Sequence, residues 1–359
     1  MKILTFHIGS LGDTLVSVPA LWVIRKHFRD ATLTLLSDSQ VGKNYVRPQD
    51  ILEGSGLVDD YLSYPVDKSR AGKFLRPLRI MRLLMALRAR RFDAPIYLIC
   101  TKGREPRVSR DIRFFQLAGI KKFIGTEGFI TYPEKVSGRP LPIVPQVGDQ
   151  YLIRLAASGI AVPPHSKGCT DLNIGESEEA AVKSWLAKLP YDEGKQWIGV
   201  GIGGKQPVNI WPLERYEDIG KQLINSFDLW PVIFGGPEDR SAGHALVTRW
   251  ARGYVAAGAL NVRQSIAALQ RCVLFVGNDT GTMHMAAAAG VKCVGIYSSR
   301  NYPGEWDPYG SGHIVLRTPV ECEGCMLEKC EEKKMKCIMA IRVDQVYNAC
   351  EKILREVDS

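Results

Sequence analysis

The sequence predicts an α/β protein made of two doubly wound domains, each with a parallel sheet covered by helices on both faces. The chain has 359 residues, of which 45% are hydrophobic, and this is enough for two domains with buried cores. Short apolar runs alternate with helical stretches along the whole chain, which is typical of parallel sheets. The alternation restarts after Pro163 and Pro164, and a proline pair disfavours both helix and central strand.

The first half of the chain predicts one such domain. We expect its strands at residues 2–8, 32–37, 61–64, 94–100 and 122–125. We expect its helices at residues 12–28, 73–91, 107–118 and 146–159. The stretch 159–169, which contains the proline pair, is the expected linker.

The second half repeats the pattern. We expect strands at residues 197–202, 231–234, 273–276, 292–296 and 313–317. We expect helices at residues 213–226, 240–252, 265–271, 282–289 and 344–355. The predicted domains are therefore 1–165 and 166–340, followed by a C-terminal helix in 341–359. Two such domains side by side leave a cleft between the carboxyl ends of their sheets, where doubly wound folds bind ligands.

Charge and hydropathy narrow the class of protein. The formal net charge is +9, and basic residues gather between Lys68 and Arg113, where those up to Arg91 alternate with apolar residues at helical spacing. Such a surface favours phosphates, carboxylates or an anionic membrane face. No apolar run is long enough to span a bilayer, and Gly9, Gly12 and Asp13 interrupt any signal-peptide core. We expect a cytoplasmic protein, with peripheral contact at the inner face of the membrane.

The strongest chemical motif follows the apolar run VLFV at 273–276. The residues GNDTGTMH from Gly277 to His284 lead into an alanine-rich helix. A strand, a turn of small residues and a helix start present free backbone N–H groups and partial positive charge to one point, which suits a pyrophosphate. Thr280, Gly281 and Thr282 are short enough for phosphates to approach their N–H groups, Asp279 is placed to orient the turn, and His284 could donate to phosphate. An ordinary strand-to-helix connection with a capping residue fits the same run.

Three weaker motifs accompany it. In HIGSLGDTL, residues 7–15, Asp13 falls in the first turn of a helix, where it could act as a general base or merely stabilise the helix start. In GVGIGGKQPVNIWP, residues 199–212, Lys205 adds a point charge beside flexible glycines. In FGGPEDR, residues 234–240, Glu238 and Asp239 could accept hydrogen bonds from ribose hydroxyls, or serve only as first-turn helix residues.

Taken together and in this order, the four motifs resemble those of the bacterial lipopolysaccharide heptosyltransferases, glycosyltransferase family nine. The resemblance covers nearly the whole chain and depends most on GNDTGTMHMAAAAG followed by the strand VKCVGIY. It implies a GT-B fold with an acceptor-binding N-terminal domain and a C-terminal domain that binds the nucleotide sugar.

The resemblance also implies an inverting transfer of heptose or a related sugar from a nucleotide-diphosphate donor to an anionic glycan or glycolipid acceptor. It assigns Asp13 as the general base, the loop Asp279–His284 to the donor diphosphate, and Glu238 or Asp239 to the nucleoside. Family members often carry a lysine two residues before the Trp-Pro pair, where this chain has Asn209, so Lys205 is expected to supply that charge. Lys205, His284 and the N–H groups of residues 280–282 are expected to stabilise the leaving diphosphate, so no cofactor is required for catalysis.

Two other features are assigned by composition. Cys322, Cys325, Cys330 and Cys337 lie close together in sequence, which fits either a structural zinc site or reduced, packed thiols. The cations expected at the cleft edge for the acceptor are Lys102, Arg104 and Arg107.

Two other functions compete with transfer. One is a sugar-nucleotide epimerase of the same architecture, which would need no acceptor. The other is a non-catalytic binding module that uses the basic face. No nucleic-acid partner is expected, because no aromatic-rich or helix-turn-helix pattern accompanies the charge.

Overall fold

The computed structural model describes residues 1–40, 45–67, 69–100, 105–136, 138–190 and 194–357. The chain forms two compact units, which are residues 1–132 with 147–173, and residues 133–146 with 174–359. The units differ in extent from the predicted domains, because the chain crosses from one to the other at three points. Within the described residues, no helix is long and apolar enough to cross a membrane.

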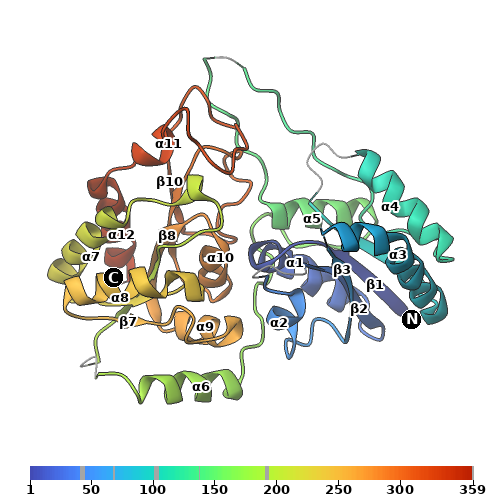
Figure 1. The fold of residues 1–359 in the computed structure, drawn as a ribbon, viewed down its shortest axis with the longest axis horizontal. Helices are drawn as coiled ribbons and strands as arrows, with labels where there is room; N and C mark the ends of the chain where they lie inside the picture. Colours follow the sequence, from blue (N-terminus) through green and yellow to red (C-terminus); the bar gives the residue numbers. More distant parts are fainter. Residues whose placement is uncertain (41–44, 68, 101–104, 137, 191–193, 358–359) are drawn as a thin grey trace. The chain divides into compact units, whose positions relative to one another are not determined.

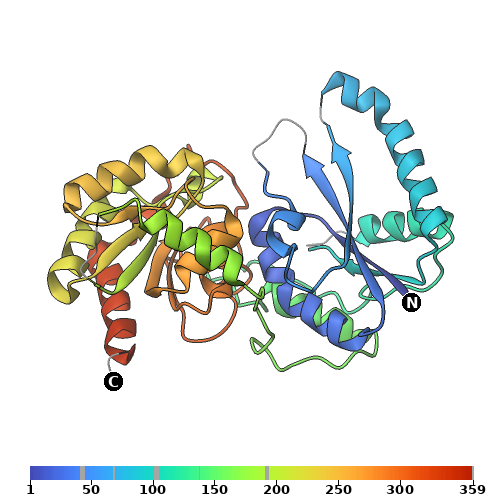
Figure 2. The same ribbon diagram turned by 90° about the horizontal axis from the view of Figure 1, so that it is seen from below.

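The first unit contains a four-stranded parallel sheet in the order β3-β2-β1-β4 (Figure 1). Its strands are β1 (Lys2–His7), β2 (Thr32–Gln40), β3 (Asp60–Val66) and β4 (Ala94–Leu98). Its helices are α1 (Leu11–His27), α2 (Pro48–Leu52), α3 (Arg70–Arg90), α4 (Glu105–Leu117) and α5 (Val147–Ala157). Helices α1 and α5 pack together on one face of the sheet, and α3 and α4 pack together on the other (Figure 2).

The strand expected at residues 122–125 is wrong. This segment forms a single bridge between Ile96 and Ile124, with two backbone hydrogen bonds to the β4 region, and no further ladder. Gly125 has φ +74°, which turns the chain out of the extended conformation that a strand needs.

The second unit contains a six-stranded parallel sheet in the order β10-β9-β8-β5-β6-β7. Its strands are β5 (Trp197–Gly201), β6 (Trp230–Ile233), β7 (Tyr254–Val255), β8 (Cys272–Asn278), β9 (Cys293–Tyr297) and β10 (Ile314–Arg317). Its helices are α6 (Glu176–Leu186), α7 (Leu213–Phe227), α8 (Arg240–Trp250), α9 (Val262–Leu269), α10 (Gly281–Ala288), α11 (Lys336–Met339) and α12 (Val343–Val357), with short 3₁₀ turns η1 (Pro207–Asn209) and η2 (Pro237–Asp239). The predicted doubly wound α/β fold is confirmed.

Two segments that lie outside the predicted domain 166–340 complete the second unit. Residues 133–146 bind to it through backbone and side-chain hydrogen bonds, such as Val144 N to Pro303 O at 2.9 Å and Leu141 N to Glu323 Oε1 at 2.6 Å. Helix α12 contributes Val346, Ile353 and neighbouring side chains to the apolar core under α7 and α8. The final helix is thus part of this core.

The strand order of the second sheet places a ligand site. Counted along the chain from β5, it is the 3-2-1-4-5-6 order of dinucleotide-binding folds, which reverses between β5 and β8. Ligands of such sheets bind outside the carboxyl ends of the strands at this switch point. In the first sheet the corresponding point lies between β1 and β4.

Candidate functional site

A buried asparagine fixes the switch point of the second sheet. Asn278, the last residue of β8, is completely buried. Its Nδ2 donates to the carbonyls of Ile202 and Gly203 at 2.9 and 3.1 Å. Its Oδ1 accepts from Trp211 N at 3.1 Å and from the Tyr216 hydroxyl at 2.8 Å. One side chain therefore holds the loop after β5 against the loop after β8.

The start of α10 faces this held loop. Thr280 is the N-cap residue of α10, so the N–H groups of Gly281 and Thr282 lie in its first turn and have no acceptor within the helix. A Cβ on Gly204 would lie 3.1 Å from Thr280 Cγ2, so the loop after β5 passes close to the helix start. The predicted phosphate motif and the predicted glycine motif are thus brought together at one edge of the sheet, where the helix dipole favours an anion.

Asp279 stands between these loops in a polar network. Its backbone carbonyl and its Oδ2 accept from Asn209 Nδ2 at 3.2 and 3.3 Å, and Asn209 Oδ1 accepts from the Ser298 hydroxyl at 2.6 Å. Burial raises the pKa of Asp279 to about 7, although the nearby Arg300 charge acts in the opposite direction. Asn209 stands where the family named above often has a lysine. It holds Asp279 through hydrogen bonds alone and brings no positive charge to the site.

This pKa predicts a pH-dependent stability. Between about pH 4, where an unfolded aspartate ionises, and about pH 7, the folded protein keeps the Asp279 proton and the unfolded chain loses it. The contribution of Asp279 to the free energy of unfolding is therefore fully present below about pH 4 and is lost as the pH rises to about 7. We expect Asp279→Asn to gain stability relative to the wild type by on the order of 2 kcal/mol between pH 5 and pH 8. Urea unfolding at several pH values measures this, and parallel pH curves for both proteins would contradict it.

An arginine that the sequence motifs did not indicate lies beside Asp279. Arg300 is buried three residues after β9, and its guanidinium donates to Gln206 Oε1 at 2.5 Å, Leu327 O at 2.7 Å and Met326 O at 3.0 Å. All three acceptors are neutral, and no carboxylate among the described residues forms an ion pair with Arg300. A fixed buried cation at a phosphate-type helix start strengthens the attraction for an anion.

The remaining predicted donor-side residues are at the same edge but differ in exposure. Lys205 is exposed on the loop after β5. His284 is buried in α10, with its ring 6.2 Å from the Trp306 ring. Burial lowers the pKa of His284 to about 4, so the imidazole is neutral near pH 7 and donates from one nitrogen only.

The two acidic residues after β6 differ in their contacts and exposure. Asp239 accepts from Gly236 N at 3.0 Å, and burial raises its pKa. A Cβ on Gly203 would overlap the Asp239 carboxylate, so these two loops are in close contact. Glu238 is exposed at the same edge. Asp239 is therefore largely occupied in holding the loop, and Glu238 is presented to solvent.

In the first unit, Asp13 occupies the first turn of α1. Its Oδ2 accepts from Ser10 N at 3.1 Å, and the side chain is half-buried. Gly9 has φ +146°, and a Cβ there would overlap the Asp13 side chain, so only glycine fits this turn. The carboxylate thus lies just past β1, beside that sheet's switch point.

A second carboxylate, which the sequence motifs did not indicate, supports this turn. Asp38 is buried near the end of β2, and its Oδ1 accepts from Gly9 N at 3.3 Å and from the Tyr45 hydroxyl at 2.8 Å. The Tyr45 hydroxyl oxygen also lies 2.5 Å from Gly9 O, so its one hydrogen is shared between these two acceptors. Asp38 and Tyr45 therefore hold the backbone that presents Asp13. Asp38 lies at the carboxyl end of a buried strand, and this position is the sequence signal that could have indicated it.

His7, the last residue of β1, completes the support. Its Nδ1 lies 3.1 Å from Leu98 O and its Nε2 lies 3.2 Å from the Thr14 hydroxyl. Burial lowers the pKa of His7, although Asp13 acts in the opposite direction.

The predicted acceptor cations are only partly described. Lys102 and Arg104 lie outside the described residues. Arg107 Nε is 3.7 Å from Asp111 Oδ2, and the Tyr97 hydroxyl donates to the same carboxylate oxygen at 3.0 Å. Arg110 pairs with the other oxygen of the same carboxylate at 2.7 Å, so Arg107 shares Asp111 with a second, closer arginine.

The structure does not support the zinc alternative for the four clustered cysteines. In the part of the chain that the structure describes, no three histidine, cysteine, aspartate or glutamate side chains are grouped so that they could hold a metal ion. Cys337 is buried, whereas Cys325 is exposed. Burial raises the pKa of Cys322, and the neighbouring Cys325 and Cys337 raise it further. Cys322, Cys325 and Cys330 lie in the loop after β10 and Cys337 lies in α11, all as free thiols, and this corrects the zinc alternative.

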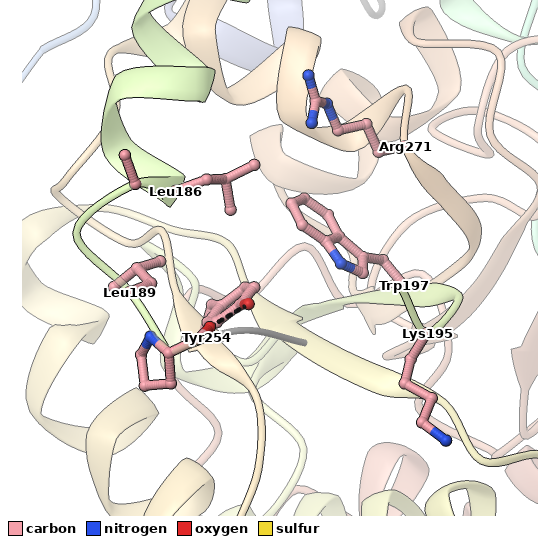
Figure 3. A pocket seen from close by; sticks show the side chains of 8 residues that line it. Leu186, Leu189, Lys195, Trp197, Tyr254 and Arg271 are labelled. Atoms are coloured by element: carbon pink, nitrogen blue, oxygen red, sulfur yellow. Dashed lines mark hydrogen bonds between the residues drawn. The ribbon is translucent and has the colours of Figure 1, made fainter. Parts of the chain in front are cut away.

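A cavity of about 560 Å³ lies elsewhere on the second unit, lined by Trp197, Tyr254, Lys195, Arg271 and apolar residues near the end of α6 (Figure 3). Trp197 is the first residue of β5, so this cavity is at the amino ends of the strands. The cavity therefore lies at the opposite end of the strands from the loops around Asp279.

Comparison with known proteins finds similarity to glycosyltransferases. Residues 161–336 match the model of glycosyltransferase family 9 (heptosyltransferase). Lipopolysaccharide heptosyltransferase 2 of Salmonella typhimurium is 33% identical over 98 residues, which are 25% of this chain and 27% of that protein. The aligned stretch thus spans about a quarter of this curated relative.

Solved structures match over nearly the full length. The glycosyl transferase family 9 structure from Veillonella parvula has a TM-score of 0.73 at 22% identity and covers 99% of this chain and 97% of that one. Heptosyltransferase WaaC of E. coli with ADP-2-deoxy-2-fluoro heptose has a TM-score of 0.62 at 17% identity, with 98% and 99% covered. At these identities the likeness establishes the fold.

Proposed function

We propose that this chain, which has the GT-B fold and is similar to glycosyltransferase family 9 (heptosyltransferase) over residues 161–336, is an inverting glycosyltransferase that uses a nucleotide-diphosphate sugar. One observation carries the proposal. At the switch point of the second sheet, the start of α10, the glycine loop after β5 and the buried Arg300 converge. Together they offer N–H groups, a helix dipole and a fixed cation to a diphosphate.

The donor would be held by these groups with its nucleoside toward β6. Glu238 is exposed there, whereas Asp239 is engaged with its own loop, so we assign the ribose hydroxyls to Glu238. Lys205 and His284 are further candidates for the phosphates. An ADP-linked heptose or related sugar is the proposed donor, because the E. coli structure of the same fold was solved with an ADP-heptose analogue.

The chemistry is a single displacement. The Asp13 carboxylate accepts the proton of an acceptor hydroxyl as that oxygen bonds to the anomeric carbon. The bond from the anomeric carbon to the diphosphate oxygen breaks, and the diphosphate leaves with the electron pair. Its negative charge is stabilised by the α10 N–H groups and Arg300. Attack opposite the leaving group inverts the anomeric configuration, and the proposal needs no cofactor.

The acceptor is proposed from charge alone. Basic residues of the first unit, with Arg107 among them, favour an anionic glycan or glycolipid hydroxyl. Lys102 and Arg104 remain candidates from the sequence, and Arg107 shares its nearest carboxylate, Asp111, with Arg110.

A panel of nucleotide sugars, each incubated with glycan and glycolipid acceptors and followed by mass spectrometry, tests the proposal. Transfer with inversion and release of the nucleoside diphosphate is the expected result. Conversion of a nucleotide sugar to its epimer without any acceptor would contradict the proposal.

Arg300→Met should weaken the binding of ADP by roughly 10- to 100-fold, because a charge-assisted contact contributes about 1.5–3 kcal/mol. Isothermal titration calorimetry measures this affinity. Arg252→Met is the matched control, since Arg252 packs over Trp230 at the other edge of the sheet and pairs with Asp228. Equal ADP affinity in the two variants would show that Arg300 does not serve the donor.

A further inference from the structure

Helix α3 is apolar on the face that it turns toward the core of the first unit. Leu87 is completely buried, and Leu83 and Leu84 pack against the same cluster, which includes Phe6 and Phe115. This inner face accounts for the stability of the helix on the sheet.

The opposite face of α3 is apolar as well. Phe74, Leu78, Met81 and Met85 recur at intervals of four, three and four residues, so they form one stripe along the helix. Their side chains are 85%, 49%, 53% and 57% exposed. Single exposed apolar residues are ordinary, but a continuous stripe of large ones marks an interaction surface. The stripe is roughly 17 Å long, from the helical rise over eleven residues.

Arginines flank this stripe. Arg76, Arg82 and Arg88 are exposed, and the helix contains no acidic residue between Arg70 and Arg90. Within the described part of the chain these three arginines form no ion pair, whereas Arg79 pairs with Asp67. The first turns of α3, drawn in light blue, extend past the end of β3 (Figure 2).

We propose that the outer face of α3 docks on the surface of an anionic lipid bilayer. The four apolar side chains enter the boundary between headgroups and acyl chains, and Arg76, Arg82 and Arg88 contact lipid phosphates. Charge complementarity selects this occupant. Two copies of so cationic a stripe repel each other, and a nucleic acid leaves the apolar side chains without a partner. The inference is independent of the donor and goes beyond the proposed transfer activity.

Co-sedimentation of the full chain with vesicles tests the inference. We expect binding to phosphatidylcholine vesicles that contain phosphatidylglycerol, weaker binding as salt rises, and little binding to phosphatidylcholine alone. Phe74→Ser combined with Met81→Ser should lower the partition coefficient on the order of tenfold or more. Leu117→Ser is the matched control, because Leu117 is 65% exposed at the end of α4 and should have no effect.

Other outcomes would overturn the inference. Equal binding of the double variant and the Leu117 variant would remove α3 from the contact. A concentration-dependent dimer of the wild type that the double variant lacks would assign the stripe to a second copy. Circular dichroism of each variant verifies folding, and ADP binding by the same samples reports the donor site separately, so the two proposals fail independently.

Discussion

Asp13→Asn is expected to reduce the rate of sugar transfer by roughly 10²- to 10⁴-fold while leaving the affinity for ADP unchanged. The substitution preserves size and removes the proton-accepting charge. Because the proposed donor groups are all in the second unit, loss of this charge should appear in kcat and spare nucleotide binding. Transfer measured by nucleoside diphosphate release, together with calorimetric titration of ADP, separates the two effects.

Asp50 offers a control with the same backbone contact at a helix start, and it also pairs with the Arg47 guanidinium. Its Oδ2 accepts from the N-cap nitrogen of α2, Arg47 N, at 3.0 Å, as Asp13 accepts from Ser10 N at the start of α1. If Asp13 only stabilises a helix start, Asp13→Asn and Asp50→Asn should have similar, small effects on both stability and transfer. A large loss of transfer in the Asp13 variant alone supports the general base, and intact transfer in that variant contradicts it.

The fold was predictable wherever a local pattern dominates. Strands such as β8 are apolar runs that end in glycine and asparagine, and the helices after them begin at small or capping residues. The short elements were missed for a physical reason. Helix α2 has five residues and strand β7 has two, so neither is long enough to show a period. These elements are stable only because the surrounding unit holds them.

The exchange of segments between the two units has no local signature. Residues 133–146 carry few apolar side chains in a regular pattern, and they are fixed by single contacts such as Leu141 N to Glu323 Oε1. Such a contact joins residues that are distant in sequence. A single boundary drawn at the proline pair therefore could not anticipate it.

The candidate site divides in the same way. Asp13, Asp279 and Thr280 were predicted because they follow strands in turns of small residues, where the chemistry is readable locally. Asp38 and Arg300 were missed because their importance comes from neighbours contributed by other loops. Sequence motifs indicated the turns at which we propose a ligand site, and the structure adds the side chains that hold those turns.

Asn278→Ala should lower the free energy of unfolding of the second unit by about 2–5 kcal/mol. The side chain makes four hydrogen bonds in a fully buried position, and its removal leaves the Trp211 N–H and the Ile202 carbonyl without this partner. Each buried polar group left unsatisfied costs about 1–3 kcal/mol. Urea unfolding followed by tryptophan fluorescence reports this unit, because every tryptophan except Trp22 belongs to it.

The same variant tests whether the held loops matter for the donor. Tyr216→Phe removes one of the four bonds and should cost only about 1 kcal/mol, with ADP affinity nearly unchanged. Asn278→Ala releases the loop after β5 from the loop after β8. The nucleotide must then order these loops when it binds, which costs part of its binding free energy. ADP should therefore bind more weakly to Asn278→Ala even at temperatures where the variant is fully folded. Unchanged ADP affinity in the folded Asn278 variant would mean that this asparagine stabilises the sheet without preparing the phosphate site.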